Sequence, residues 1–213
     1  MKQGMKHFYI RGLLSMEIRI LEEHGYDAAL IGLSLSYYRE GTDFNSWYDA
    51  AKQNKAAKQL ATLAFKGGGH NKALESINVW FLMTATRGFY QEFDTYRVGI
   101  TKNSASSMHT LAKEMTTKAN FAPGTSSQAI SAFNRCLYEY TDISSPYFKD
   151  ITRLKNNLPE GYLQTRQVCV NYMTLQNIVR QRQGHRLRSW DAFIVSLLEQ
   201  LEHPELIIEP END

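Results

Sequence analysis

"FDTYRVGITKNSASSMH", residues 93–109, is the stretch of this sequence that says most about its fold. It concentrates an arginine, an asparagine, a histidine and several hydroxyl side chains, with few apolar residues among them. A surface loop has such a composition. A binding site for a phosphate or a nucleotide has it too, because polar side chains and backbone amides surround the anion there. The rest of the chain must decide between these two interpretations.

The composition is that of an ordinary globular protein. Of the 213 residues, 43% are hydrophobic, and a net charge of +2 is too small for a protein that wraps nucleic acid. The sequence lacks a signal peptide and the ~18-residue apolar run of a membrane helix. Cys136 and Cys169 lie far apart, which favours reduced thiols in a cytoplasm. We therefore expect a cytoplasmic protein with a single domain over residues 1–205, an acidic tail over 206–213, frayed from the residues after His203, and no membrane contact.

Hydrophobic patterning predicts two early strands followed by helices. Residues 16–26 alternate as a strand does, and residues 76–85 have its β-branched and aromatic density. Helices are predicted at 27–38, with Asp27 as N-cap, and at 45–65, 87–96, 124–140, 168–183 and 189–203. This order indicates an α+β fold, a small twisted antiparallel sheet with packed helices.

Two local motifs allow more than one interpretation. "KGGGH" at 66–70 lacks the Lys-Ser/Thr pair of a phosphate loop, so its glycines fit a helix end at least as well. Asn171 and Asn177 would lie ~120° apart on one helix, so they can share a ligand only across the helix or if the helix begins between them. The six histidines show no metal-binding spacing, and we expect no metal site.

Taken together, these segments resemble the flavin-dependent thymidylate synthases, which methylate the uracil of dUMP. "FKGGGHNKALESINVWF" resembles the family's His-Gly-His segment, and "YRVGITKNSASSMH" resembles its RHRxxSxNExSxR signature. "LPEGYLQTRQVCVNYMTLQN" and "NIVRQRQGH" resemble the Leu-Pro segment and the arginine that follows it. The resemblance spans roughly residues 15–200 and implies a fold like that of the thymidylate synthase-complementing proteins.

The resemblance also implies roles for particular residues. It places the flavin adenine dinucleotide (FAD) on His70, Glu75, Arg97, Asn103, Asn171 and Asn177. It places the substrate on Glu92, Ser104, Ala105, Ser106, Lys155 and Arg182, with Ser106 and Arg182 as catalytic residues. The implied co-substrates are a reduced folate and NADPH, the implied ligand is a pyrimidine deoxynucleotide monophosphate, and the implied assembly is a homotetramer with shared sites. Signatures this altered resemble those carried by bacterial viruses.

The sequence also departs from the family at several positions. The signature's last arginine, which binds the nucleotide phosphate, is Met108, and a second substrate arginine is Lys155. Losing a bidentate arginine removes a charge-assisted phosphate contact, which favours a binding protein without turnover as the alternative function. Glu92 replaces a glutamine and would favour the amino group of cytosine if it faced the base. The alternative is that Glu92 contacts the ribose or pairs with Lys155 or Arg182, and then it does not select the base.

Overall fold

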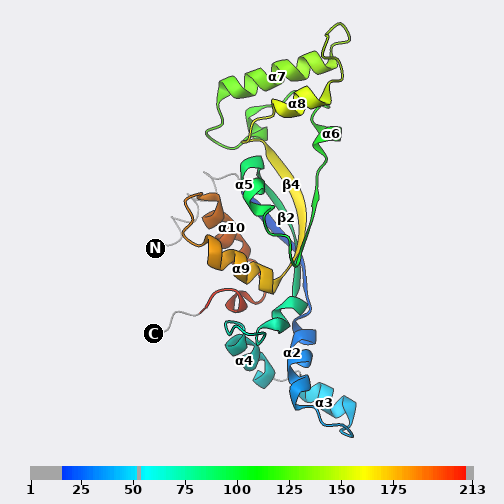
Figure 1. The fold of residues 1–213 in the computed structure, drawn as a ribbon, viewed down its shortest axis with the longest axis vertical. Helices are drawn as coiled ribbons and strands as arrows, with labels where there is room; N and C mark the ends of the chain where they lie inside the picture. The colour runs from blue at the N-terminus through cyan, green and yellow to red at the C-terminus, as the bar shows by residue number, and fades with distance from the viewer. Residues whose placement is uncertain (1–15, 52–53, 210–213) are drawn as a thin grey trace. The chain divides into compact units, whose positions relative to one another are not determined.

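A computed structural model of the protein describes residues 16–51 and 54–209. Four antiparallel strands form one sheet, in the order β1 (Glu17–His24), β2 (Asn78–Thr86), β4 (Leu163–Asn171) and β3 (Ile100–Ser104). Strands β2 and β4 are therefore neighbours although they are far apart in the sequence (Figure 1). The α+β prediction is confirmed, and the two early strands lie where the patterning placed them.

The chain groups into two compact units, and each is described by itself. Among the described residues, unit 1 comprises Met83–Thr95 and Asn103–Gln167, together with Met16 and Glu17. Unit 2 comprises the described residues of 18–82 and of 168–209, together with Tyr96–Lys102. The predicted division into a domain over 1–205 and a tail over 206–213 stays a prediction.

Unit 1 has its core beneath a pair of helices. Its helical elements are α5 (Arg87–Phe93), α6 (Ser107–Thr110), η3 (Lys118–Asn120), α7 (Ser127–Thr141) and α8 (Ile151–Asn156). Helices α7 and α8 lie side by side (Figure 1). Between them and the neighbouring loops the chain buries Leu111, Phe121, Ile130, Phe133, Leu137, Leu154 and Leu158. This core fixes α8, which carries Lys155, one of the predicted substrate residues.

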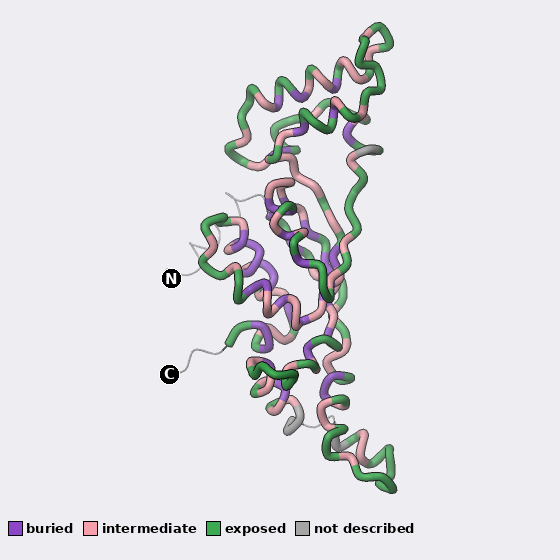
Figure 2. Tube along the Cα trace, in the orientation of Figure 1, coloured by how far each residue is buried: buried purple, intermediate pink, exposed green. Residues whose placement is uncertain are grey.

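Unit 2 has an aromatic core against helices α9 and α10. Its helical elements are α2 (Tyr26–Ser34), η1 (Leu35–Tyr37), α3 (Phe44–Ala51), α4 (Asn54–Leu63), η2 (Lys72–Ser76), α9 (Tyr172–Arg182), α10 (Ser189–Leu198) and η4 (Pro204–Leu206). Buried positions recur along α9 and α10 (Figure 2). The side chains of Phe81, Tyr172, Trp190 and Phe193 are fully buried there. None of the described helices is long and apolar enough to cross a bilayer.

Three predicted element boundaries were wrong or incomplete. Asp27 is not the N-cap of α2, because the helix begins at Tyr26 after Gly25, and Asp27 lies in the first turn. The helix predicted at 45–65 is two helices, α3 and α4, and positions 52–53 between them lie outside the described residues. Fraying after His203 was expected, but Leu206 and Ile207 are buried and only 210–213 lie outside the described residues.

The helix predicted at 168–183 begins at Tyr172, four residues later than predicted. Residues 168–171 complete strand β4, and Val168 and Val170 are both buried with less buried residues between them. This period of two is that of a strand with one face in the core. It was missed because the apolar run continues directly into the helical pattern of α9. Cys169 therefore lies on a strand and not on a helix.

Candidate functional site

The opening stretch meets the start of α9 within unit 2. The Asn171 backbone N–H donates to the Gly99 carbonyl at 2.9 Å, and the Thr174 hydroxyl donates to the Val98 carbonyl at 2.8 Å. The Asn171 side chain accepts the Thr174 N–H at 2.8 Å and so caps α9. Two segments that the sequence predicted to share a site are thus hydrogen-bonded together. Asn171 acts as a structural cap at this junction.

Arg182, a predicted catalytic residue, is packed against aromatic rings of unit 2. Its Nε donates to the Tyr96 hydroxyl at 2.9 Å, and its guanidinium carbon lies 4.7 Å from the centre of the Trp190 ring. Its Nη1 lies 3.1 Å from Nε2 of His185. These contacts hold the guanidinium in one orientation, with part of its hydrogen-bonding capacity already used.

The two predicted flavin-binding asparagines do not share a helix. Because α9 begins at Tyr172, the open alternative that the helix begins between Asn171 and Asn177 is confirmed. The side-chain Oδ1 of Asn177 accepts hydrogen bonds from the side chains of Arg180 and Gln181, each at 3.1 Å. Arg97, also predicted at the cofactor, is exposed in the loop before β3.

A cavity of about 680 Å³ in unit 2, called the unit 2 cavity below, contains the predicted residue His70. Its lining residues are Leu33, Ser36, Tyr37, Lys58, Gln59, Thr62, Leu63, Gly68, Gly69, His70 and Lys72. Gly68 and Gly69 have φ values of +72° and +84°, and the space above them is open. Glu75 is exposed in η2 and does not line this cavity.

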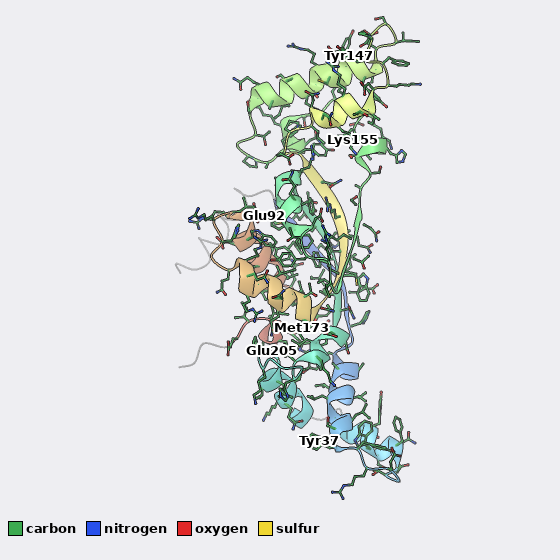
Figure 3. The ribbon with its side chains drawn as sticks, in the orientation of Figure 1. Tyr37, Glu92, Tyr147, Lys155, Met173 and Glu205 are labelled. Atoms are coloured by element: carbon green, nitrogen blue, oxygen red, sulfur yellow. The ribbon has the colours of Figure 1, made fainter. Side chains whose placement is uncertain are left out.

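A second cavity, of about 240 Å³, lies in unit 1 and is called the unit 1 cavity below. Its lining residues are Arg87, Tyr90, Gln91, Asp94, Ser107, Lys155, Leu158, Tyr162, Gln164 and Arg166. Lys155 is the predicted substrate residue among them and projects from α8 (Figure 3). Three cations against one carboxylate make this cavity electropositive.

Arg166 is held on several sides by its neighbours in the unit 1 cavity. Its guanidinium carbon lies 3.8 Å from the centre of the Tyr90 ring, and its side chain is 16% exposed. Its Nη1 donates to both oxygens of Asp94, each at 2.9 Å, and its Nε donates to Oε1 of Gln164 at 3.1 Å. The ring below and the acceptors at its edge hold the guanidinium plane in place.

Tyr90 forms the floor beneath Arg166. Its hydroxyl donates to the Met83 carbonyl at 2.6 Å and also lies 3.1 Å from the Gln164 carbonyl. Burial raises the pKa of Tyr90 far above its ordinary value, and Asp94 raises it further, while Arg166 lowers it. Burial likewise raises the pKa of Tyr172, whose hydroxyl donates to Glu23.

These raised pKa values predict alkaline instability. A tyrosine of the unfolded chain ionises near pH 10, whereas folded Tyr90 keeps its proton, so stability is complete below pH 10 and falls as the pH rises above it. We expect each such tyrosine to remove up to about 1.4 kcal/mol per pH unit. Urea titrations between pH 8 and 11 measure the slope. Tyr90→Phe should flatten it, exposed Tyr138→Phe should not, and equal slopes for wild type and Tyr90→Phe would contradict the prediction.

The other predicted substrate residues lie beside the unit 1 cavity in the sequence but do not line it. Its lining includes Gln91 and Ser107 in place of their neighbours Glu92 and Ser106. Ser104, Ala105 and Ser106 are exposed. The Ala105 N–H donates to the Thr165 carbonyl at 3.0 Å, so this amide is used within the sheet.

Of the predicted residues, the substrate set lies in unit 1 except for Arg182, and the flavin set lies in unit 2 except for Asn103. Asn103 is exposed on β3, where its amide lies 3.4 Å from Gln167. The sequence did not single out Arg87, Gln91, Ser107 or Arg166. No pattern in the sequence singled out Arg166, because strand β4, on which it lies, was not predicted.

One cluster of potential metal ligands occurs among the described residues. Ligand atoms of Glu23, Glu202 and His203 lie within 4.8 Å of one another. Structural hydrogen bonds already use the Glu23 carboxylate, which accepts from the Tyr172 hydroxyl and, at 3.0 Å, from the Glu202 N–H. His203 stacks on Tyr26 with ring centres 3.6 Å apart. We interpret the cluster as a set of structural contacts that stabilise unit 2. The absence of a metal stays a prediction.

Comparison with known proteins places this geometry on a known fold. No protein-family sequence model matches the chain, and no curated protein matches it either. A crystal structure of thymidylate synthase X (ThyX) from Helicobacter pylori with FAD and dUMP superposes with a TM-score of 0.70, at 17% identity, over 91% of this chain and 97% of that one. A second structure of flavin-dependent ThyX from Helicobacter pylori, complexed with FAD and dUMP, gives 0.69 at 17% identity, over 90% and 97%. The predicted resemblance is confirmed at the level of structure: this chain has the ThyX fold.

Proposed function

We propose that this protein is a divergent flavin-dependent thymidylate synthase-like enzyme that transfers a one-carbon group to C5 of a pyrimidine deoxynucleotide, dUMP or dCMP. The observation that carries the proposal is the electropositive unit 1 cavity in a chain with the ThyX fold. Its volume of about 240 Å³ lies just below the ~300 Å³ typical of the smallest ligand pockets, which suits a mononucleotide better than a dinucleotide.

The lining of the unit 1 cavity supports recognition of both ends of such a nucleotide. Lys155 offers an ammonium group to the phosphate. Gln91 offers an amide that both donates and accepts, so it can pair with the edge of uracil or of cytosine. Gln91 lines the cavity and Glu92 does not, so we assign the contact with the base edge to Gln91, and the preference for cytosine that Glu92 would give stays a prediction. Ser106 and Arg182 remain the proposed catalytic residues.

The unit 2 cavity fits the flavin that this fold implies. Lys58, His70 and Lys72 are donors suited to a diphosphate, and the open backbone at Gly68 and Gly69 lets an anion approach closely. Tyr37, which is 73% exposed, offers an aromatic face to a ring system (Figure 3). When bound, FAD supplies the two-electron redox chemistry, and the chain binds and orients it. Asn171, Asn177, Arg97, Asn103 and Glu75 complete the proposed flavin set.

The proposed reaction needs partners beyond the chain. A reduced folate gives the carbon and NADPH gives the electrons, while the C5 hydrogen of the pyrimidine leaves as a proton. Sites assembled from several copies, as in a homotetramer, would bring the two residue sets to one substrate.

The test has a binding arm and a chemical arm. Equilibrium dialysis with FAD should yield yellow protein with flavin absorbance bands, and His70→Ala should weaken this binding by about 10-fold, as loss of one charge-assisted contact does. Incubation with FAD, NADPH, a one-carbon folate and dUMP or dCMP tritiated at C5 should release tritium into water. Absence of flavin binding together with absence of tritium release would refute the enzyme.

A second function is favoured by one specific observation. Arg182 is engaged by Tyr96, His185 and Trp190, and the signature's phosphate-binding arginine is Met108. A protein that keeps the nucleotide cavity but lacks turnover is the alternative. Such a protein would bind dUMP or dCMP in equilibrium dialysis but would release no tritium in the reaction mixture.

A further inference from the structure

The unit 1 cavity distributes its positive charge unequally among three side chains. Arg87 is occupied by the chain itself, since its Nη1 donates to the Leu158 carbonyl at 2.7 Å and its Nη2 lies 3.6 Å from Glu160. These two bonds tie β2 and α5 to the segment after α8. Arg87 therefore has a structural task that a ligand would have to disrupt.

Arg166 is held differently. Its Nε and Nη1 are bound by Gln164 and Asp94, and Tyr90 supports the face of the guanidinium. Its Nη2 has no hydrogen-bond partner among residues 16–51 and 54–209. None of the described residues has a buried side-chain polar atom without a partner, so Nη2 of Arg166 reaches solvent. Its two N–H groups are held in a fixed orientation and are therefore available to an anion.

Lys155 supplies a second charge that is still available. It is exposed on α8, and no acceptor among the described residues lies within hydrogen-bonding distance of its ammonium group. Asp94 neutralises part of the charge of Arg166. Since Glu160 likewise offsets Arg87, Lys155 gives the cavity its excess positive charge, which suits an anion such as a phosphomonoester.

We propose that Arg166 is the phosphate-anchoring residue of the unit 1 cavity, with Nη2 donating to the phosphate and Lys155 as the second ligand. Arg166 thereby takes the place of the guanidinium lost at Met108, from a different segment of the chain. Asp94 is a positioning residue that orients Arg166 and does not itself contact the phosphate. The assignment rests on the proposed function, since it assumes that a nucleotide monophosphate is the ligand.

Calorimetric titration with dUMP and with deoxyuridine, which lacks the phosphate, tests the assignment. For wild type we expect dUMP to bind well above deoxyuridine. Arg166→Gln should weaken dUMP binding by about 10- to 100-fold, the effect of losing one charged hydrogen bond, and leave deoxyuridine binding unchanged. Arg135→Gln, which makes the same charge change at an exposed position on α7, should leave both unchanged.

The outcomes separate this assignment from the proposed function. If wild type binds dUMP and Arg166→Gln binds it equally well, Arg166 is not the anchor and the proposed function stands. If wild type binds neither dUMP nor dCMP, both ideas fall. Should Arg166→Gln fail to fold by circular dichroism, Arg166→Lys keeps the charge without the planar fork. It should weaken dUMP binding by about 5-fold, and wild-type affinity for this variant would overturn the assignment.

Discussion

Replacing Trp190 with alanine should lower the free energy of unfolding by about 3–5 kcal/mol, the usual cost of removing a large buried aromatic ring. Trp190 is fully buried in α10, and its ring meets Tyr96 and Phe193 edge-on, with ring centres 6.1 and 5.7 Å away. Aromatic pairs in this geometry add to the stabilisation that burial provides. The deletion leaves a cavity that the surrounding rings cannot fill without moving.

Removing the Trp190 ring also removes packing contacts of Arg182, the proposed catalytic residue. The guanidinium of Arg182 lies over the Trp190 ring, and its Nε is bonded to Tyr96, which packs against the same ring. Urea denaturation followed by circular dichroism measures the change. Trp47→Ala, at a less buried position on α3, is the control and should cost clearly less. A loss below about 1 kcal/mol for Trp190→Ala would show that this core relaxes freely, contrary to the prediction.

The parts of the fold that the sequence predicts are those with an uninterrupted period. Strand β2 alternates cleanly, with Val79, Phe81, Met83 and Ala85 all buried, and its prediction is confirmed. Strand β4 was missed because Val168 and Val170 run without a break into the apolar positions of α9. Asn171 marks the boundary as an N-cap, but a single asparagine in an apolar run cannot be recognised as a cap from sequence alone.

The site shows the same limit. His70 and Lys155, predicted from resemblance, each line a cavity. Gln91 and Ser107 line the unit 1 cavity and their neighbours Glu92 and Ser106 do not, which the sequence could not show because the phase of a short helix is not visible in it. The roles of Glu92 and Ser106 stay predictions. Arg166 could not be predicted by any local pattern, since its partner Asp94 lies 72 residues away in the sequence.

Gly99 links the opening stretch to the predicted flavin residues, and its backbone explains why glycine is there. Its φ is +64°, a conformation that costs an L-residue about 1–2 kcal/mol. A Cβ at this position would lie 2.4 Å from the Asn171 amide nitrogen and 2.6 Å from the Thr174 hydroxyl. Both side chains belong to the cap that starts α9, so any added atom must displace it.

Gly99→Ala should therefore cost about 2–4 kcal/mol, the backbone strain together with roughly 1 kcal/mol or more for the disturbed cap. Gly184→Ala is the matched control: its φ is +71° and a Cβ there meets nothing within 4 Å, so it reports the backbone strain alone. Urea denaturation of both variants isolates the steric part as the difference between them. If Asn171 is also a flavin ligand, Gly99→Ala should weaken FAD binding in equilibrium dialysis while Gly184→Ala does not. Equal losses of stability in the two variants would mean that displacing the Asn171 cap costs no free energy. The prediction that residue 99 and the start of α9 are energetically coupled would then be wrong.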